Sequence, residues 1–176
     1  MAAETDTFDI GRLRLGAGEG RRLALATSFA PLRFADVDYT ADDADVILDI
    51  SRMTGNGYSM RLRFETDVRG MCMRCLEDAV IHQAVDAREV NQPGGGDDLT
   101  SPYLDGKEEL LDLVGWARDA LVLALPVQLS CPDTDACLAR QRAMLGTDDA
   151  EDGTRTESAE PEKDPRWAKL DELKFD

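Results

Sequence analysis

The sequence predicts an α+β fold, in which a mainly antiparallel β-sheet is covered by one long helix. Apolar and polar side chains alternate without a break over residues 58–69, which is typical of a long, half-buried strand in an antiparallel sheet. Over residues 107–125 the apolar side chains recur instead at helical spacing. The chain has 176 residues, which is enough to bury the core of one domain.

The first half of the chain contains further strand signals. Leucines alternate with arginines on both sides of a glycine-rich segment at 16–20, which predicts two strands around a loop. Alternating apolar residues predict another strand over residues 44–51. A turn at 53–57 then leads into the long strand, because asparagine and glycine tolerate positive φ. We expect about five to seven strands in all, within the usual range for one sheet.

The long strand runs into a short turn that holds Cys72 and Cys75. Residues 79–90 are compatible with a returning strand, so the turn is predicted to form the tip of a hairpin. Residues 91–101 contain Pro93 and three glycines and are predicted to form a loop.

The predicted long helix runs from about Lys107 to Leu125. Asp105 is its candidate N-cap, with Glu108 completing a capping box, and Pro126 ends the pattern. Its apolar stripe is expected to cover the apolar face of the sheet. A further short helix is predicted within residues 136–144.

The predicted organisation is one domain over residues 1–145, followed by two tail segments. Residues 146–163 are acidic and poor in apolar side chains, which predicts a disordered linker. Residues 164–176 regain apolar side chains at helical spacing, including Trp167. This predicts a short C-terminal helix that docks on this domain or on a partner.

Composition narrows the class of protein. No basic start followed by an apolar run is visible, and the longest nearly uncharged run, residues 120–130, is too short to span a bilayer. We therefore expect a soluble, cytoplasmic protein with no membrane partner. In a reducing cytosol, disulfides between its cysteines are not expected.

The four cysteines of the chain occur as two local pairs. Cys72 and Cys75 have C-x2-C spacing, and Cys131 and Cys137 have C-x5-C spacing. Two local pairs joined by a long connection are typical of a four-thiolate zinc site, which would be closed and structural. Simple burial of free cysteines is the alternative, and the lone His82 is an alternative fourth ligand in place of Cys137.

A net charge of −16 argues against nucleic acid, but the charge is unevenly spread. Five arginines against Glu19 give residues 12–33 a net charge of +4, and five arginines against two acids give residues 52–74 a net charge of +3. The candidate residues for RNA or partner binding are Arg52, Arg61, Arg63, Arg69, Arg74 and Trp167.

Two other interpretations of these charges remain open. The arginines could belong to ordinary solvated strand faces. The excess of carboxylates could instead hold a basic protein partner. An enzyme is not expected, because the chain has one histidine and its glycine-rich segment lies between predicted strands and not before a helix. No small-molecule substrate is therefore predicted.

Three sequence features together resemble the YceD-like family, the large ribosomal RNA subunit accumulation proteins, often described only as a domain of unknown function. They are the turn Cys72-Met-Arg-Cys75-Leu76, the helix end RDALVLALP followed by Cys131, and the C-terminal DPRWAKLDELK. The resemblance covers roughly residues 13–173. By position, Cys72, Cys75 and Cys131 match the cysteines of the family. The chain departs from the family pattern at CPDTDACLARQRAMLG, which lacks the later cysteines of many relatives.

The resemblance implies a non-enzymatic ribosome-biogenesis factor that acts on the accumulation or processing of large-subunit ribosomal RNA. The implied partners are that RNA or its precursor, and a small protein of the large ribosomal subunit. The alternative function is a protein-interaction module, stabilised by structural zinc, that binds a basic partner without direct contact to RNA.

Overall fold

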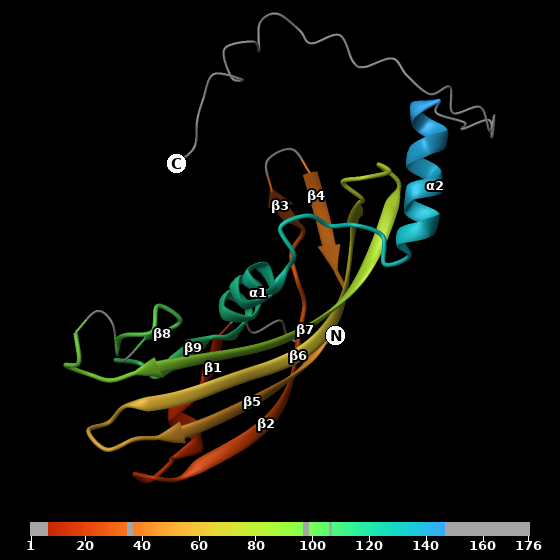
Figure 1. Ribbon diagram of the computed structural model, residues 1–176. Coiled ribbons are helices and arrows are strands. Elements are labelled where there is room, and N and C mark those ends of the chain that lie inside the picture. Colours follow the sequence, from red (N-terminus) through yellow and green to blue (C-terminus); the bar gives the residue numbers. More distant parts are fainter. Residues whose placement is uncertain (1–6, 35–36, 97–98, 106, 147–176) are drawn as a thin grey trace, which may run out of the picture.

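The computed structural model describes residues 7–34, 37–96, 99–105 and 107–146. These residues form a six-stranded and a three-stranded antiparallel sheet with two short α-helices (Figure 1). The larger sheet has the order β2-β5-β6-β4-β3, and β7 pairs with β6. Its strands are β2 (Gly20–Thr27), β3 (Leu32–Phe34), β4 (Val37–Ala41), β5 (Ala44–Arg52), β6 (Tyr58–Met71) and β7 (Asp78–Asn91). The smaller sheet has the order β1-β9-β8, with β1 (Thr7–Asp9), β8 (Leu104–Asp105) and β9 (Leu110–Asp112).

The hairpin of β6 and β7 runs the length of the larger sheet. The two strands pair from Tyr58 opposite Asn91 to Met71 opposite Asp78 without a break in register. The predicted long strand and its returning partner are thereby confirmed. Figure 1 shows this hairpin curving from the end beside β8 to the end beside α2, so it connects the two ends of the molecule.

One face of the larger sheet forms the core. Alternate residues of β5 and β6, among them Val46, Leu48 and Leu62, are fully buried. Helix α1 (Leu113–Ala124) lies against β7 and buries Trp116 and Leu121. Burial of this apolar face is the main stabilising contribution, because each large side chain removed from water contributes about 1.5–3 kcal/mol. The opposite, outer face carries most of the polar side chains of β5 and β6.

The prediction of one long helix covering the sheet is wrong. α1 has 12 residues and begins at Leu113, where the Asp112 carboxylate accepts a hydrogen bond from the backbone N–H of Gly115 at 2.8 Å. The preceding residues form β8 and β9, and Glu109 has a φ of +54°, which no α-helix accommodates. The fold is therefore a mostly antiparallel β-sheet with two short helices.

The expected capping box is replaced by a local turn. The Asp105 carboxylate accepts from the backbone N–H of Lys107 at 2.8 Å, two residues on, which closes a turn and leaves no cap for a helix starting there. Leu110 and Leu111 precede Asp112, and two adjacent apolar residues satisfy strand and helix periodicity equally. Pairing of β9 with β1 decides for a strand.

The second helix, α2 (Thr134–Leu145), is longer than the predicted 136–144. The Asp133 carboxylate caps its start by accepting from the backbone N–H of Ala136 at 3.0 Å, and Gly146 ends it with a φ of +65°. Apart from Gly146, the predicted linker over residues 146–163 and the predicted C-terminal helix over residues 164–176 lie outside the described residues. No helix of the described residues is both long and apolar enough to cross a membrane.

Candidate metal centre and nucleic-acid interface

The tip of the β6–β7 hairpin is a tight turn built around Cys72. The backbone N–H of Cys72 donates to the carbonyl of Glu77 at 2.8 Å, and the N–H of Leu76 donates to the carbonyl of Cys72 at 2.9 Å. The N–H of Arg74 points at the Cys72 sulfur, 3.4 Å away. The turn reverses at Leu76, whose φ is +58°. This geometry presents the sulfurs of Cys72 and Cys75 on one side of the tip.

The second cysteine pair lies where α2 begins. Cys131 precedes the helix, and Cys137 lies in its first turn, where its backbone N–H donates to the carbonyl of Asp133 at 3.1 Å. The intervening loop is tied to the hairpin tip, because the N–H of Met73 donates to the carbonyl of Leu129 at 2.8 Å. The two pairs, some fifty residues apart in the chain, therefore meet at one end of the molecule.

All four sulfur atoms lie within 4.8 Å of one another. The Sγ atoms of Cys72 and Cys137 are 3.7 Å apart, and those of Cys75 and Cys131 are 3.5 Å apart. Both separations far exceed a disulfide bond of about 2.05 Å, so the cysteines are free. Four thiolates at about 2.3 Å from a tetrahedral zinc ion lie about 3.8 Å apart. The donor set therefore fits a four-coordinate metal ion with no open position.

The protonation of the thiols matches a site that requires a cation. Burial raises the pKa of Cys72. Hydrogen bonds from backbone N–H groups, that of Cys75 first, outweigh this effect and lower the pKa to about 6. Burial and the neighbouring thiol of Cys75 raise the pKa of Cys131 to about 12. Burial and the thiol of Cys72 also raise the pKa of Cys137. Without a cation, Cys72 is thus the first of these three thiols to lose its proton, because negative sulfurs this close repel one another.

Helix α2 is attached to the domain through this cluster. Cys137 is its one buried residue, whereas Leu138, Met144 and Leu145 are exposed. An amphipathic helix would instead bury a stripe of apolar side chains. The cysteine cluster therefore replaces a hydrophobic face as the attachment of α2.

His82 does not belong to the cluster. It lies on the outer face of β7, where its Nδ1 is 2.9 Å from Oδ1 of Asp67 and its Nε2 is 3.5 Å from Oε2 of Glu65. The hydrogen bond to Asp67 raises the pKa of His82. The imidazole of His82 is therefore held by two carboxylates and not by a metal ion.

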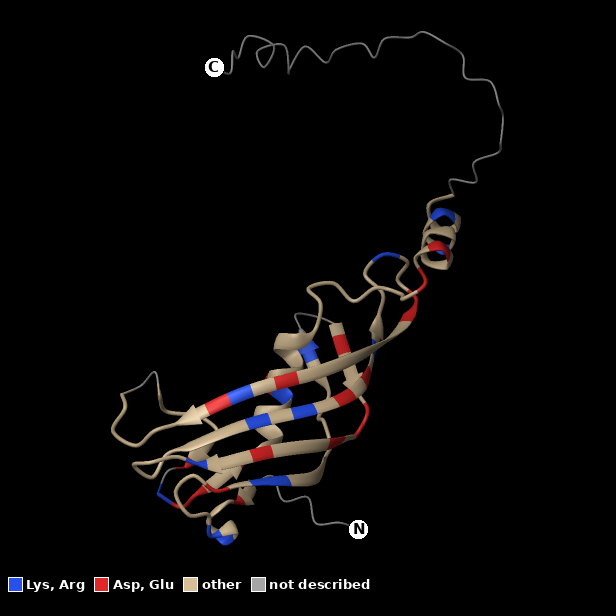
Figure 2. Ribbon diagram, turned by 60° about the horizontal axis from the view of Figure 1, so that its bottom comes forward, with Lys and Arg blue, Asp and Glu red and all other residues tan. Residues whose placement is uncertain are grey.

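Three of the predicted RNA-binding arginines lie together on the outer face of β6, and each has an acidic partner. Arg61 Nε is 2.8 Å from Oδ1 of Asp86. Arg63 Nη2 is 2.6 Å from Oδ2 of Asp49, and Arg69 Nη2 is 2.8 Å from Oδ2 of Asp42. Figure 2 shows the arginines on neighbouring strands and more frequent acidic positions towards the α2 end.

The other predicted binding residues lie elsewhere. Arg52 is half-buried where the two sheets meet, with Nη1 at 3.2 Å from Oε1 of Glu109 and 2.5 Å from the hydroxyl of Tyr58. Arg74 lies in the hairpin tip, beside the cysteines. Trp167 lies outside the described residues. Binding of RNA or a partner by any of these residues stays a prediction.

The chain was compared with protein families, curated proteins and solved structures. Residues 60–174 match the family model described as "Large ribosomal RNA subunit accumulation protein YceD". The chain belongs to the YceD family. The match includes both cysteine pairs and both α-helices, so the cluster lies within the part of the chain that defines the family. No curated protein and no solved structure matches the chain.

Sequence reasoning missed three outer-face residues of this YceD family member. Arg22, Asp49 and Arg88 lie beside Arg61 because β2, β5, β6 and β7 pair in one particular register. Each residue could be placed on a strand from its local pattern. Which residues become neighbours across strands depends on register, and one sequence does not reveal that register.

Proposed function

We propose that this chain is a non-enzymatic ribosome-biogenesis factor that supports accumulation or processing of large-subunit ribosomal RNA by binding RNA. The family match carries the proposal, because the family is named for accumulation of that RNA. The proposed partners are the large-subunit RNA or its precursor, and the proposed place of action is the cytoplasm. Neither a membrane nor a small-molecule substrate is part of this proposal.

A structural zinc ion in the cysteine cluster is part of the proposed function. The all-sulfur donor set and the separations of 3.5 and 3.7 Å favour zinc over the oxygen-seeking ions magnesium and calcium. When bound, zinc would neutralise the thiolates and hold the hairpin tip to α2. Four protein ligands would leave no position for a water or substrate, which supports a structural and not a catalytic role.

The outer sheet face supports RNA as the ligand. It is a broad, polar surface whose arginines come from several strands, and it lies opposite the face that α1 covers. A protein with a net charge of −16 needs such a local basic surface to hold a polyanion. Exposed ion pairs on a sheet stabilise a fold little, so their arginines can exchange a carboxylate for a phosphate.

A basic ribosomal protein is the second candidate partner, and one observation favours it. The α2 end of the outer face gathers carboxylates from the turn before β5 and from β5 and β6, namely Asp43, Asp45, Glu65 and Asp67. Such a surface complements a lysine- and arginine-rich partner.

Capture of partners from cell lysate, with and without nuclease, tests the proposal. We expect the tagged chain to retain large-subunit ribosomal RNA, and nuclease to remove most of the other captured material. Depleting the protein should lower mature large-subunit RNA relative to small-subunit RNA. If capture of a ribosomal protein withstands nuclease and no RNA is retained, the interaction-module alternative replaces RNA binding. Normal levels of both RNAs after depletion would refute the role in accumulation.

A further inference from the structure

A row of charged residues crosses the outer face of the larger sheet. Arg22 of β2 pairs with Asp49 of β5, Asp49 pairs with Arg61 of β6, and Arg61 pairs with Arg88 of β7. We call these four residues the arginine row. Neighbouring strands lie about 4.8 Å apart, so the row spans about 14 Å. It is therefore long enough to touch more than one phosphate of a nucleic-acid strand.

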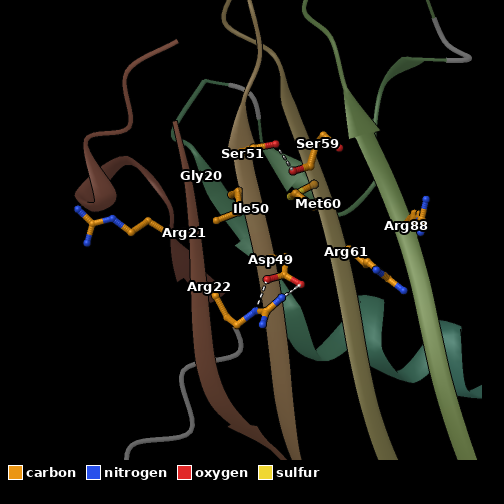
Figure 3. A pocket seen from close by; sticks show the side chains of 10 residues that line it. All are labelled: Gly20, Arg21, Arg22, Asp49, Ile50, Ser51, Ser59, Met60, Arg61 and Arg88. Carbon is orange, nitrogen blue, oxygen red and sulfur yellow. Dashed lines mark hydrogen bonds and ion pairs between the residues drawn. The ribbon is translucent and has the colours of Figure 1, made fainter. Parts of the chain in front are cut away.

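The row lines an open groove of about 630 Å³. The next positions along the strands are Gly20, Ser51 and Ser59, which also line the groove (Figure 3). Their small side chains leave the arginine side chains accessible from above. Figure 3 shows Arg22 and Arg61 reaching across the sheet face, whereas Arg21 points away from the row.

The row and its immediate neighbours carry an excess of positive charge. Arg22, Arg61, Arg63 and Arg88 face Asp49 and Asp86, so four positive and two negative charges leave a net charge of +2. Asp49 is shared by Arg22 and Arg63, at 2.6 Å from each. Among the described residues, no carboxylate lies within 4.0 Å of the Arg88 guanidinium. Arg88 is thus a donor group available to a ligand.

The side-chain pairs hold the arginines ready without enclosing them. The Arg22 side chain is 68 % exposed although its Nε is 2.6 Å from Asp49. Arg61 is 37 % exposed beside Asp86. Such exposed pairs contribute about 0–1 kcal/mol, whereas an arginine fork can bind a phosphate through two parallel hydrogen bonds.

We infer that the arginine row binds the sugar–phosphate backbone of RNA without reading its sequence. This inference rests on the proposed function and names the binding surface for it. Arginine forks match phosphate oxygens, and the groove lining contains no aromatic side chain on which a base could stack. An acidic peptide would meet the same charges, but the row is broad and lacks the apolar anchors of a protein interface.

The test measures RNA affinity of the full chain with and without the row. The probe is a short, fluorescently labelled single-stranded RNA of mixed sequence, titrated at several salt concentrations between about 50 and 200 mM. The main variant combines Arg22→Ala, Arg61→Ala and Arg88→Ala. The matched control removes the same charge from three other exposed arginines through Arg12→Ala, Arg33→Ala and Arg118→Ala.

The row variant should bind RNA about 50-fold more weakly, since each lost phosphate contact costs about fourfold near physiological salt. The slope of log affinity against log salt should become shallower by about 2, at about 0.7 for each contact. The control should stay within about threefold of the parent protein, because its arginines lie outside the row. Asp49→Asn, which removes a competing carboxylate, should strengthen binding several-fold.

Thermal unfolding of each variant shows whether it is folded. If the triple variant does not fold, the single variant Arg88→Ala replaces it, and its RNA affinity should fall about fourfold. If the row and control variants lose affinity equally, the inference is wrong although RNA binding stands. If the parent chain shows no salt-sensitive RNA binding, the RNA-binding part of the proposed function fails together with the inference. Binding of an acidic peptide through the row, without RNA, would also overturn it.

Discussion

Replacing Cys137 with serine should detach α2 from the domain and leave the β6–β7 hairpin folded. Among the described residues of α2, Cys137 alone is buried, so the cluster is the attachment of this helix. A serine hydroxyl does not replace a thiolate as a zinc ligand. Once detached, a 12-residue helix is only marginally stable in water.

The variant should lose both zinc affinity and α-helical signal, and the size of each loss can be estimated. Structural zinc binding releases about 10–16 kcal/mol, so one of four ligands accounts for about 3–4 kcal/mol, or about a 100- to 1000-fold loss of affinity. α1 and α2 contain 12 residues each, so unfolding α2 removes up to half of the α-helical signal of the described residues.

Three measurements check this prediction. Elemental analysis should find about one zinc ion per parent chain and less in Cys137→Ser. Far-ultraviolet circular dichroism should show the loss of helix, and hydrogen exchange should show lost protection in α2 but not along β6. Ala139→Ser is the matched control, because it introduces the same side chain at an exposed position of the same helix. It should keep both the metal and the helical signal.

Acidification should also release the zinc ion and detach α2. Protons compete with the metal for the thiolates, so metal affinity falls as the pH falls. The Cys72 thiolate, with a pKa of about 6, is the last of the three shifted thiols to be protonated without metal. Zinc should be retained at neutral pH and released to a chelator below about pH 6. If Cys137→Ser keeps its zinc and its full helical signal, the cluster does not hold α2 and our reasoning is refuted.

Three further changes test the fold around the site. Leu76→Gly should stabilise the domain by about 0.5–1 kcal/mol in urea unfolding, because Leu76 has a φ of +58° and is 54 % exposed; a loss of stability would show that its side chain matters more than its backbone. Gly70→Ala should destabilise it by about 1–3 kcal/mol, since the added Cβ would lie 2.3 Å from the Tyr39 ring, and unchanged stability would contradict this packing. Tyr58→Phe should cost about 1 kcal/mol by removing the hydroxyl that donates to Glu109 at 2.7 Å. Burial and Glu109 raise the pKa of Tyr58 to about 12, so its contribution is complete below about pH 10 and is lost as the pH rises towards 12; this alkaline loss should be smaller in the phenylalanine variant.

Local patterns predicted the parts of the fold that depend on few neighbours. The alternation over residues 58–69 identified β6, because a strand half buried over that length leaves a period of two in its sequence. C-x2-C spacing similarly predicted the hairpin tip. The long-helix prediction is wrong at residues 107–112, where Leu110 and Leu111 suit both periods and pairing with β1 selects a strand.

By itself, the sequence determined the long hairpin, the two local cysteine pairs and the resemblance to the YceD family. These depend on side chains close together in the chain, whose spacing is a property of the backbone geometry. Only the tertiary structure decided that the two pairs meet within 4.8 Å and that Arg22, Arg61 and Arg88 share one row. Such neighbours are set by strand register and by the path of the chain between elements, which result from the packing of the whole domain.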